Sequence, residues 1–118
     1  MNYKRAIEDY MPENEKERRE KEVILSSINT YGDAILTREV EVIHMTSSGF
    51  IMNEELDNVL MIYHNIYDSW SWTGGHADGE EDMLKVAIKE AREETGAVNI
   101  RALTDKCISW EILPVNSH

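Results

Sequence analysis

The sequence predicts a small α/β domain with a mixed sheet, preceded by an N-terminal helix. A length of 118 residues allows one modest core and a single domain. Helical and strand-like segments alternate along the chain, and apolar residues make up 42% of it, which is typical of a globular protein. We therefore expect a helical extension over residues 1–33 and the α/β domain over residues 34–118.

Residues 13–31 predict the N-terminal helix. Their first half is almost entirely charged, whereas the second half carries apolar side chains that can dock on a core, namely Val23, Ile24, Leu25 and Ile28. Pro12 precedes the helix, where a proline is tolerated, and Gly32 ends it. We interpret this helix as a solvated extension docked at one end, with a homodimer contact or a lid as the alternatives.

Strand-like segments occupy the middle and the end of the chain. Residues 34–46 predict one or two short strands. Residues 47–52 and 58–64 predict clearer strands, and the polar connection between them indicates a hairpin. Because residues 58–64 are apolar almost throughout, we expect that strand to be buried on both faces. The last strands are expected over residues 98–103 and 107–115.

The second predicted helix covers residues 82–95, with Asp82 as its N-cap and Gly96 as the residue that ends it. On a helical wheel one arc is apolar, and the opposite arc is basic, with Lys85, Lys89 and Arg92. This pattern predicts a helix that packs one face on the sheet.

Three glutamates of this helix, Glu90, Glu93 and Glu94, converge at the border of its apolar arc because their spacing is i, i+3 and i+4. Their mutual repulsion and their place at the negative end of the helix dipole cost about 1–3 kcal/mol in total. A hard divalent cation such as Mg²⁺ prefers oxygen ligands and would offset this cost. A poorly optimised solvated face is the alternative.

A glycine-rich segment, WTGGHADGEE, precedes the helix at residues 72–81. Glycine lets the backbone turn sharply and approach a ligand, so we expect a loop here that offers a carbonyl to a cation. An Asp-Gly turn is expected at residues 78–79. His76 either contacts a phosphate or bonds to the backbone. Trp70 and Trp72 are interpreted as packing the loop onto the sheet, with stacking on a base as the alternative.

The charge balance excludes some partners. Acidic residues outnumber basic ones 23 to 12, giving a formal net charge of −11, so we expect no nucleic-acid or anionic-membrane partner. A local cation would be needed to hold an anionic substrate. Cys107 is the single cysteine, so a disulfide framework is excluded and a reducing compartment is expected. The first ten residues lack the apolar region of a secretory signal, and we expect a cytoplasmic protein.

Residues 75–97, GHADGEEDMLKVAIKEAREETGA, resemble the Nudix box. Gly75 is followed after five residues by Glu81, and seven more residues lead to Lys89-Glu90, Glu93-Glu94 and Gly96. One fixed position differs, because Lys89 stands where the family has arginine. The resemblance implies a Nudix-like α/β/α sandwich with a mixed sheet from about residue 37 to residue 118, after the N-terminal helix.

The resemblance also implies an activity. The chain would be a Nudix-type pyrophosphohydrolase that cleaves the diphosphate bond of a nucleoside diphosphate derivative or a related small phosphorylated metabolite. It would hold Mg²⁺ or Mn²⁺ through Glu90, Glu93, Glu94 and the carbonyl of Gly75. Glu90 would act as the base for a water, and the other catalytic residues would be Glu93, Lys89 and Glu81, the last pairing with Lys89 across the loop. His76 is the candidate substrate contact.

Two departures from the family keep alternatives open. Lysine is a single point donor where arginine is a planar fork, so Lys89 predicts slower chemistry or a non-catalytic nucleotide- or metal-binding regulatory module. Family domains usually continue with further strands and a closing helix, and this chain ends at His118, so we expect a domain that is incomplete at its C-terminus. An isoprenoid-diphosphate isomerase would need a paired cysteine and glutamate that the sequence does not display.

Overall fold

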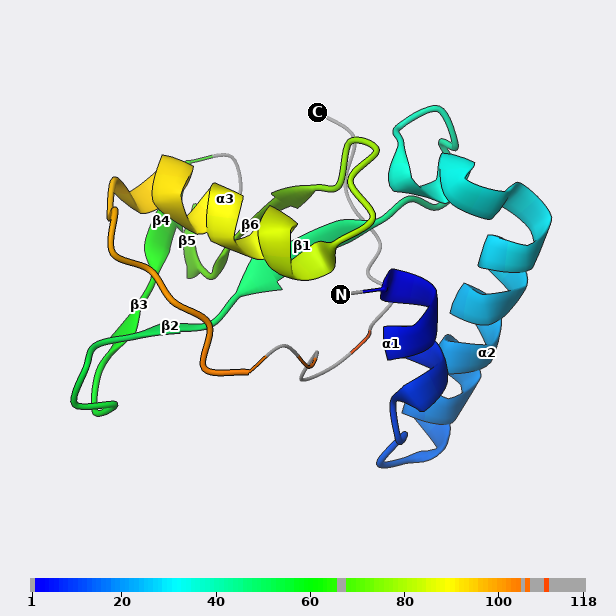
Figure 1. Cartoon of the computed structure of the whole chain (residues 1–118), viewed down its shortest axis with the longest axis horizontal. Coiled ribbons are helices and arrows are strands. Elements are labelled where there is room, and N and C mark those ends of the chain that lie inside the picture. Colours follow the sequence, from blue (N-terminus) through cyan, green and yellow to red (C-terminus); the bar gives the residue numbers. More distant parts are fainter. Residues whose placement is uncertain (1, 66–67, 105, 107–109, 111–118) are drawn as a thin grey trace.

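The computed structural model describes residues 2–65, 68–104, 106 and 110. The chain is a mixed α/β structure with helices at its N-terminus and small antiparallel sheets. Figure 1 shows the N-terminal helices on one side of the molecule, the strands on the other, and the helix α3 lying across β1 and β6.

Two helices rather than one begin the chain. The helix α2, Glu15–Tyr31, confirms the predicted N-terminal helix, and the Asn14 side chain caps it by accepting from the Glu17 N–H at 2.9 Å. The helix α1, Tyr3–Asp9, was not predicted, and Asn2 caps it in the same way. The two helices pack against each other (Figure 1).

The prediction of strands within residues 34–46 is wrong for the first part of that range. Residues Gly32–Leu36 form the 3₁₀ helix η1, and an irregular segment continues to β1. Ile35 and Leu36 are both buried, which a strand cannot do on one sheet face because neighbouring side chains point to opposite faces. The 3₁₀ turn brings both into the core.

The strands form three antiparallel pairs in the described residues. The strand β1, Thr46–Gly49, pairs with β6, Thr73–His76. The strand β2, Ile51–Met52, pairs with β3, Val59–Leu60, and β4, Ile62–His64, pairs with β5, Ser69–Ser71. The hairpin expected between residues 47–52 and 58–64 is therefore confirmed, and the Asn53 side chain closes its turn by accepting from Asp57 and Asn58 N–H groups.

Three sequence-based predictions about the strands are corrected by the structure. Residues 58–64 are not buried on both faces, because Val59 and Leu60 are 40% and 43% exposed. Residues 98–103 form no strand: they leave α3 as an exposed irregular segment without a ladder partner in the described part of the chain. The expected mixed sheet is absent from the described residues, since every pair there is antiparallel. Residues 107–115 lie outside the described residues except for Trp110.

The helix α3, Met83–Thr95, confirms the second predicted helix and both of its ends. Asp82 accepts from the Leu84 and Lys85 N–H groups at 3.0 and 3.3 Å, which makes it the N-cap. Gly96 has φ of 76°, and its N–H donates to the Arg92 carbonyl at 2.9 Å. Glycine takes this left-handed conformation without steric cost, so the helix stops there.

One hydrophobic core joins the N-terminal helices to the first turns of α3. Its buried members come from both sides of residue 33: Tyr3, Ile7, Ile24, Ile28, Ile35, Leu36, Met45, Ala77, Met83, Val86 and Trp110. The Tyr3 hydroxyl also donates to Asp33 at 2.7 Å.

Among the described helices, none has both the length and the apolar character needed to cross a membrane.

Candidate functional site

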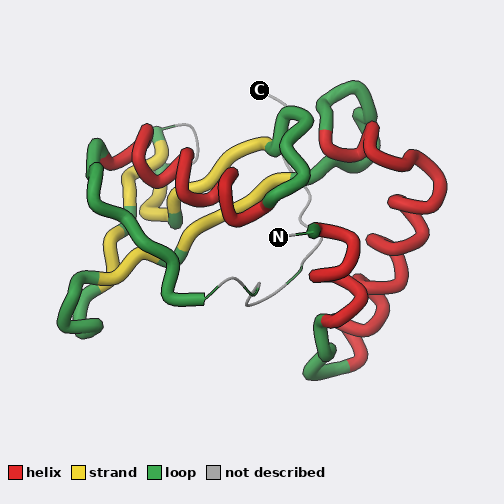
Figure 2. The backbone as a smooth tube through the Cα atoms, in the orientation of Figure 1, coloured by secondary structure: helices red, strands yellow, loops and turns green. Residues whose placement is uncertain are grey.

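The helix α3 rests on the strands β1 and β6, and this contact builds the candidate site. Figure 2 shows the two strands running side by side along the helix. The Ser47 hydroxyl donates to the Met83 carbonyl at 2.8 Å, and a Cβ at Gly49 would lie 4.0 Å from that of Ala87. Positions 47, 49, 73 and 75 therefore face α3, because alternate residues of a strand share a face.

The glycines at residues 74 and 75 lie in the strand β6, so the loop expected there is corrected. Close packing explains why glycine is needed. A Cβ at Gly75 would lie 2.5 Å from the Glu90 carboxyl carbon, and one at Gly74 would lie 2.8 Å from the Ser47 carbonyl oxygen. Real Cβ atoms do not approach so closely, so the bare strand lets the helix glutamates reach its backbone.

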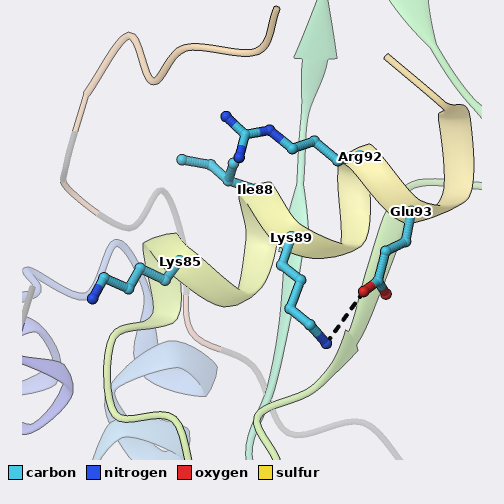
Figure 3. Close-up of a pocket in the computed structure, with 5 residues that line it drawn as sticks. All are labelled: Lys85, Ile88, Lys89, Arg92 and Glu93. Atoms are coloured by element: carbon cyan, nitrogen blue, oxygen red, sulfur yellow. Dashed lines mark ion pairs between the residues drawn. The ribbon is translucent and has the colours of Figure 1, made fainter. Parts of the chain in front are cut away.

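The three predicted metal ligands on α3 have different partners. Glu90 lies over Gly75, and the Glu94 carboxylate accepts from the Gly74 N–H at 3.0 Å. Glu93 pairs with Lys89 at 3.5 Å (Figure 3). Both members of that pair are more than half exposed, so the pair contributes at most about 1 kcal/mol.

Glu90 has the most unusual electrostatic environment of the three. It is half-buried against the strand, and burial raises the pKa of its carboxyl above the usual value. The neighbouring Glu93 raises the pKa further, Lys89 opposes the rise, and Glu94 adds a smaller increase. The helix therefore places a carboxylate where its negative charge is disfavoured.

The loop between β6 and α3 is held by a residue that sequence reasoning missed. Asp78 and Gly79 form the expected turn, with φ of 48° and 91°. Arg38 donates to both Asp78 oxygens, at 2.9 and 3.1 Å, and the Gly79 N–H donates to the Leu36 carbonyl. This bidentate pair lowers the pKa of the Asp78 carboxyl. No local pattern links Arg38 to a residue 40 positions away.

His76 ends the glycine strand and lines a cleft of about 360 Å³ together with Glu90, Lys85 and Lys89. Its ring stacks on His44 with centroids 5.1 Å apart. Burial lowers the pKa of His76, the positive charge of Arg38 and the neighbouring His44 lower it further, and Asp78 opposes the shift, so the environment favours the neutral ring.

Lys89 and Glu81 do not pair in the way that the resemblance implies. The ion pair of Lys89 is with Glu93, one helical turn along, and the described residues show none between Lys89 and Glu81. Glu81 is exposed at the start of the helix segment. The pKa of the Tyr3 hydroxyl is raised by burial, by its hydrogen bond to Asp33 and by the nearby charges of Asp33 and Glu81. Because its charge acts on Tyr3, Glu81 lies on the side of the N-terminal helices.

A second cleft, of about 440 Å³, lies on the side of α3 that faces away from the strands. Figure 3 shows the residues that line it, Lys85, Ile88, Lys89, Arg92 and Glu93. The side chains of Lys85 and Arg92 extend in different directions from the helix, so they do not converge on one point (Figure 3).

The carboxylates of α3 are suitable ligands for a hard divalent cation, although they are not grouped into a metal site in the described residues. Within the described ranges, no three His, Cys, Asp or Glu side chains are grouped closely enough to hold a metal. The chemistry of the donors is nevertheless appropriate, because Glu90, Glu93 and Glu94 offer carboxylate oxygens on one helix end. The space that a Cβ at Gly75 would fill holds the Glu90 carboxyl group instead, beside the strand backbone.

The arrangement offers a half-buried carboxylate of raised pKa beside a bare strand and a cleft that carries both lysine and histidine. Such a set is able to accept a proton from water and to contact an anion.

Comparison with models of known protein families finds no match for the chain, and comparison with curated proteins finds none.

Proposed function

We propose that this chain is a metal-dependent hydrolase of the Nudix type, which cleaves a diphosphate bond in a nucleoside diphosphate derivative or a related small phosphorylated metabolite. The observation that carries the proposal is the contact between the Glu90 carboxyl group and Gly75. These are the base and the carbonyl ligand that the resemblance implies, and they are contributed by different elements 15 positions apart.

The proposed roles follow the geometry of the helix and the strand. Glu90 accepts the proton of the attacking water, and its raised pKa makes it a stronger base than an exposed glutamate. Glu93 and Glu94, with the Gly75 carbonyl, complete the oxygen donors for Mg²⁺ or Mn²⁺. The bound cation supplies charge neutralisation for the diphosphate in a chain of net charge −11.

Two further residues of the site have supporting roles in the proposal. Lys89 holds Glu93 at 3.5 Å, so it orients that carboxylate before the cation binds. His76 lines the cleft beside Glu90 and donates one ring N–H to a phosphate oxygen. Glu81 keeps an auxiliary role in the loop, without the pairing to Lys89.

The test is the formation of nucleoside monophosphate from a panel of nucleoside diphosphate derivatives with Mg²⁺. We expect turnover by the wild type and a loss of at least about a hundredfold in Glu90→Gln, the size typical of a lost general base. Glu93→Gln, which removes a proposed metal ligand, should lose a similar amount. Glu54→Gln, which removes an exposed glutamate of the hairpin turn, is the matched control. If no substrate turns over, the hydrolase proposal fails; if Glu93→Gln is as fast as wild type, the metal assignment is wrong.

One observation favours the second candidate, a non-catalytic metal- or nucleotide-binding module. Lys89 is a point donor, and it is already engaged by Glu93 on the exposed side of α3. Calorimetry with Mn²⁺ separates the two functions. Binding that is lost in Glu90→Gln, without turnover of any substrate, would favour the module, whereas binding together with turnover would favour the enzyme.

A further inference from the structure

The helix α3 carries two cations that are not engaged in the way the earlier cations of the chain are. Before residue 80, each lysine and arginine forms an ion pair with a carboxylate or, in the case of Lys21, donates to backbone carbonyls. Lys85 and Arg92 are exposed, and the described residues show an ion pair for neither. These two charges are therefore available to an anion, in a chain of net charge −11.

Both cations line the cleft of about 440 Å³ on the side of α3 that faces away from the strands, which we call the outer cleft. Lys89 lies between them, and the half-buried Ile88 and the exposed Glu93 complete the lining (Figure 3). Three positive side chains thus share the outer cleft with one negative side chain. The sign of the charge in the cleft is opposite to that of the whole molecule.

The ion pair inside the outer cleft is easily exchanged. Lys89 Nζ and Glu93 Oε1 are 3.5 Å apart, and their side chains are 68% and 56% exposed. Exposed pairs of this kind contribute little to stability. A bound anion can therefore replace the Glu93 carboxylate as the partner of Lys89, which makes all three cations available to a ligand.

The arrangement of the cations selects an elongated anion. Lys85 and Arg92 are seven positions apart, which corresponds to about 10 Å along the helix axis. Their side chains extend in different directions, so a single compact anion cannot contact both (Figure 3). Because Lys89 lies between them, the ligand must also be anionic in its middle. A linear chain of linked phosphates has this property, and both lysine and arginine bind phosphate oxygens.

The charge of the whole molecule selects a small ligand. At physiological ionic strength the field of an exposed charge is screened over about 8 Å. The molecule measures 40 × 33 × 26 Å, so a ligand confined to the outer cleft interacts mainly with the cations that line it. A nucleic acid or an acidic protein would extend beyond the cleft over a surface of net charge −11 and would be repelled.

We propose that the outer cleft of α3 binds a small linear oligophosphate, with Lys85 and Arg92 at its two ends and Lys89 at its middle. The expected dissociation constant is of the order of 100 μM, because all three cations are exposed to solvent. The contacts require neither a divalent cation nor Glu90, so the inference does not depend on the proposed hydrolase activity.

Calorimetry without divalent cations compares inorganic diphosphate, triphosphate and tetraphosphate as ligands. We expect the affinity of the wild type to rise at least about tenfold from diphosphate to tetraphosphate, because only the longer chain contacts both ends of the cleft at once. Lys85→Gln and Arg92→Gln should each lose this increase, whereas their binding of diphosphate changes much less. Lys16→Gln and Arg5→Gln remove the same charge at side chains that are 82% and 80% exposed, and they should bind tetraphosphate like the wild type.

Glu93→Gln separates this inference from the proposed hydrolase. The substitution removes the one carboxylate among the residues that line the outer cleft, and it releases Lys89. Tetraphosphate should therefore bind at least about threefold more tightly without divalent cations. The proposed function predicts a loss of turnover with Mg²⁺ in the same variant. An absence of turnover would leave the binding result intact, and unchanged binding would leave the turnover result intact, so the two proposals fail separately.

The proposal is overturned if tetraphosphate does not bind the wild type with a dissociation constant below about 1 mM. Equal losses of affinity in Arg5→Gln and Arg92→Gln would also overturn it, because they would show a response to net charge alone. Tighter binding of a single-stranded oligonucleotide than of tetraphosphate would do the same, because it would identify a nucleic-acid surface. Circular dichroism checks that each variant keeps its helix content.

Discussion

At the scale of single residues, two adjacent glycines have different tasks. The position of a Cβ at Gly74 is blocked by backbone, with the Ser47 carbonyl oxygen at 2.8 Å and the Ser48 Cα at 3.1 Å. At Gly75 the three atoms nearest to a Cβ all belong to the end of the Glu90 side chain. Backbone cannot yield without moving the strand pair, whereas a glutamate can rotate away. The first glycine therefore serves the fold, and the second serves the placement of Glu90.

Substitution of the two glycines separates these tasks. Gly74→Ala should lower the free energy of unfolding by about 1–3 kcal/mol, the usual cost of overpacking. Gly75→Ala should cost less than about 1 kcal/mol, because Glu90 moves into solvent, but it should abolish Mn²⁺ binding. Denaturant unfolding and calorimetry measure the two effects. Equal loss of stability in both variants would contradict the assigned roles.

The pH dependence of stability tests the environment of Glu90. Its folded pKa is raised above the unfolded value near 4.5, so its contribution to stability is present below that pH and is lost as the pH rises through the folded pKa. Glu90→Gln removes this titration. Without divalent cations, the variant should melt at a higher temperature than wild type at pH 7, with a smaller difference near pH 4. A constant difference across this range would contradict the assignment.

At the scale of elements, α3 is positioned by its two ends and by the strands beneath it. Asp82 and Gly96 set where the helix begins and stops. The pairing of β1 with β6 then determines which helix residues meet which strand residues, so that Glu90 reaches Gly75 and Glu94 reaches Gly74. A helix shifted by one residue would turn these side chains by about 100° around the axis and separate them from the glycines.

Loss of the cap should therefore weaken both stability and site. Asp82→Ala removes the acceptor for two backbone N–H groups and should cost about 1 kcal/mol, within the 0.5–2 kcal/mol range for N-caps. Asp82→Asn keeps the cap and serves as the control. Urea unfolding measures the change, and a full effect in Asp82→Asn would show that charge rather than capping matters.

At the scale of the whole molecule, the N-terminal helices and α3 share one core. Ile7 of α1 is fully buried together with Met83 and Val86 of α3. The Arg38–Asp78 pair adds a link from the segment after η1 to the loop before α3. The N-terminal helices are therefore part of the support of the site rather than a separate appendage, and the interpretation of a solvated extension holds only for the charged surface of α2.

A cavity in the core at Ile7 of α1 should therefore lower the free energy of unfolding of the whole chain. Ile7→Ala should cost about 2–5 kcal/mol, the range for large-to-small changes in a core. Because the core is shared, helix content by circular dichroism and tryptophan emission should shift to lower denaturant together. Emission that stays unchanged while helix content is lost early would show that the helices unfold independently.

The features of this protein that have local causes can be predicted from its amino-acid sequence. The limits of α3 follow from Asp82 and Gly96, the end of α2 follows from Gly32, and the hairpin follows from a polar connection between apolar runs. These signals act within a few residues of the chain, so they can be recognised in the sequence before the fold is known. The spacing of Glu90, Glu93 and Glu94 on one helix face is legible for the same reason.

Which of those groups come into contact depends on how the helices and strands pack together. The strand predictions over residues 34–46 and 98–103 failed because a strand depends on a distant partner, and η1 instead turned two apolar neighbours into the core. The glycines were expected in a loop, yet the partner strand and α3 hold them in β6. The contact of Glu90 with Gly75 and the pairing of Arg38 with Asp78 join residues far apart in the chain, and such proximity is set by packing alone.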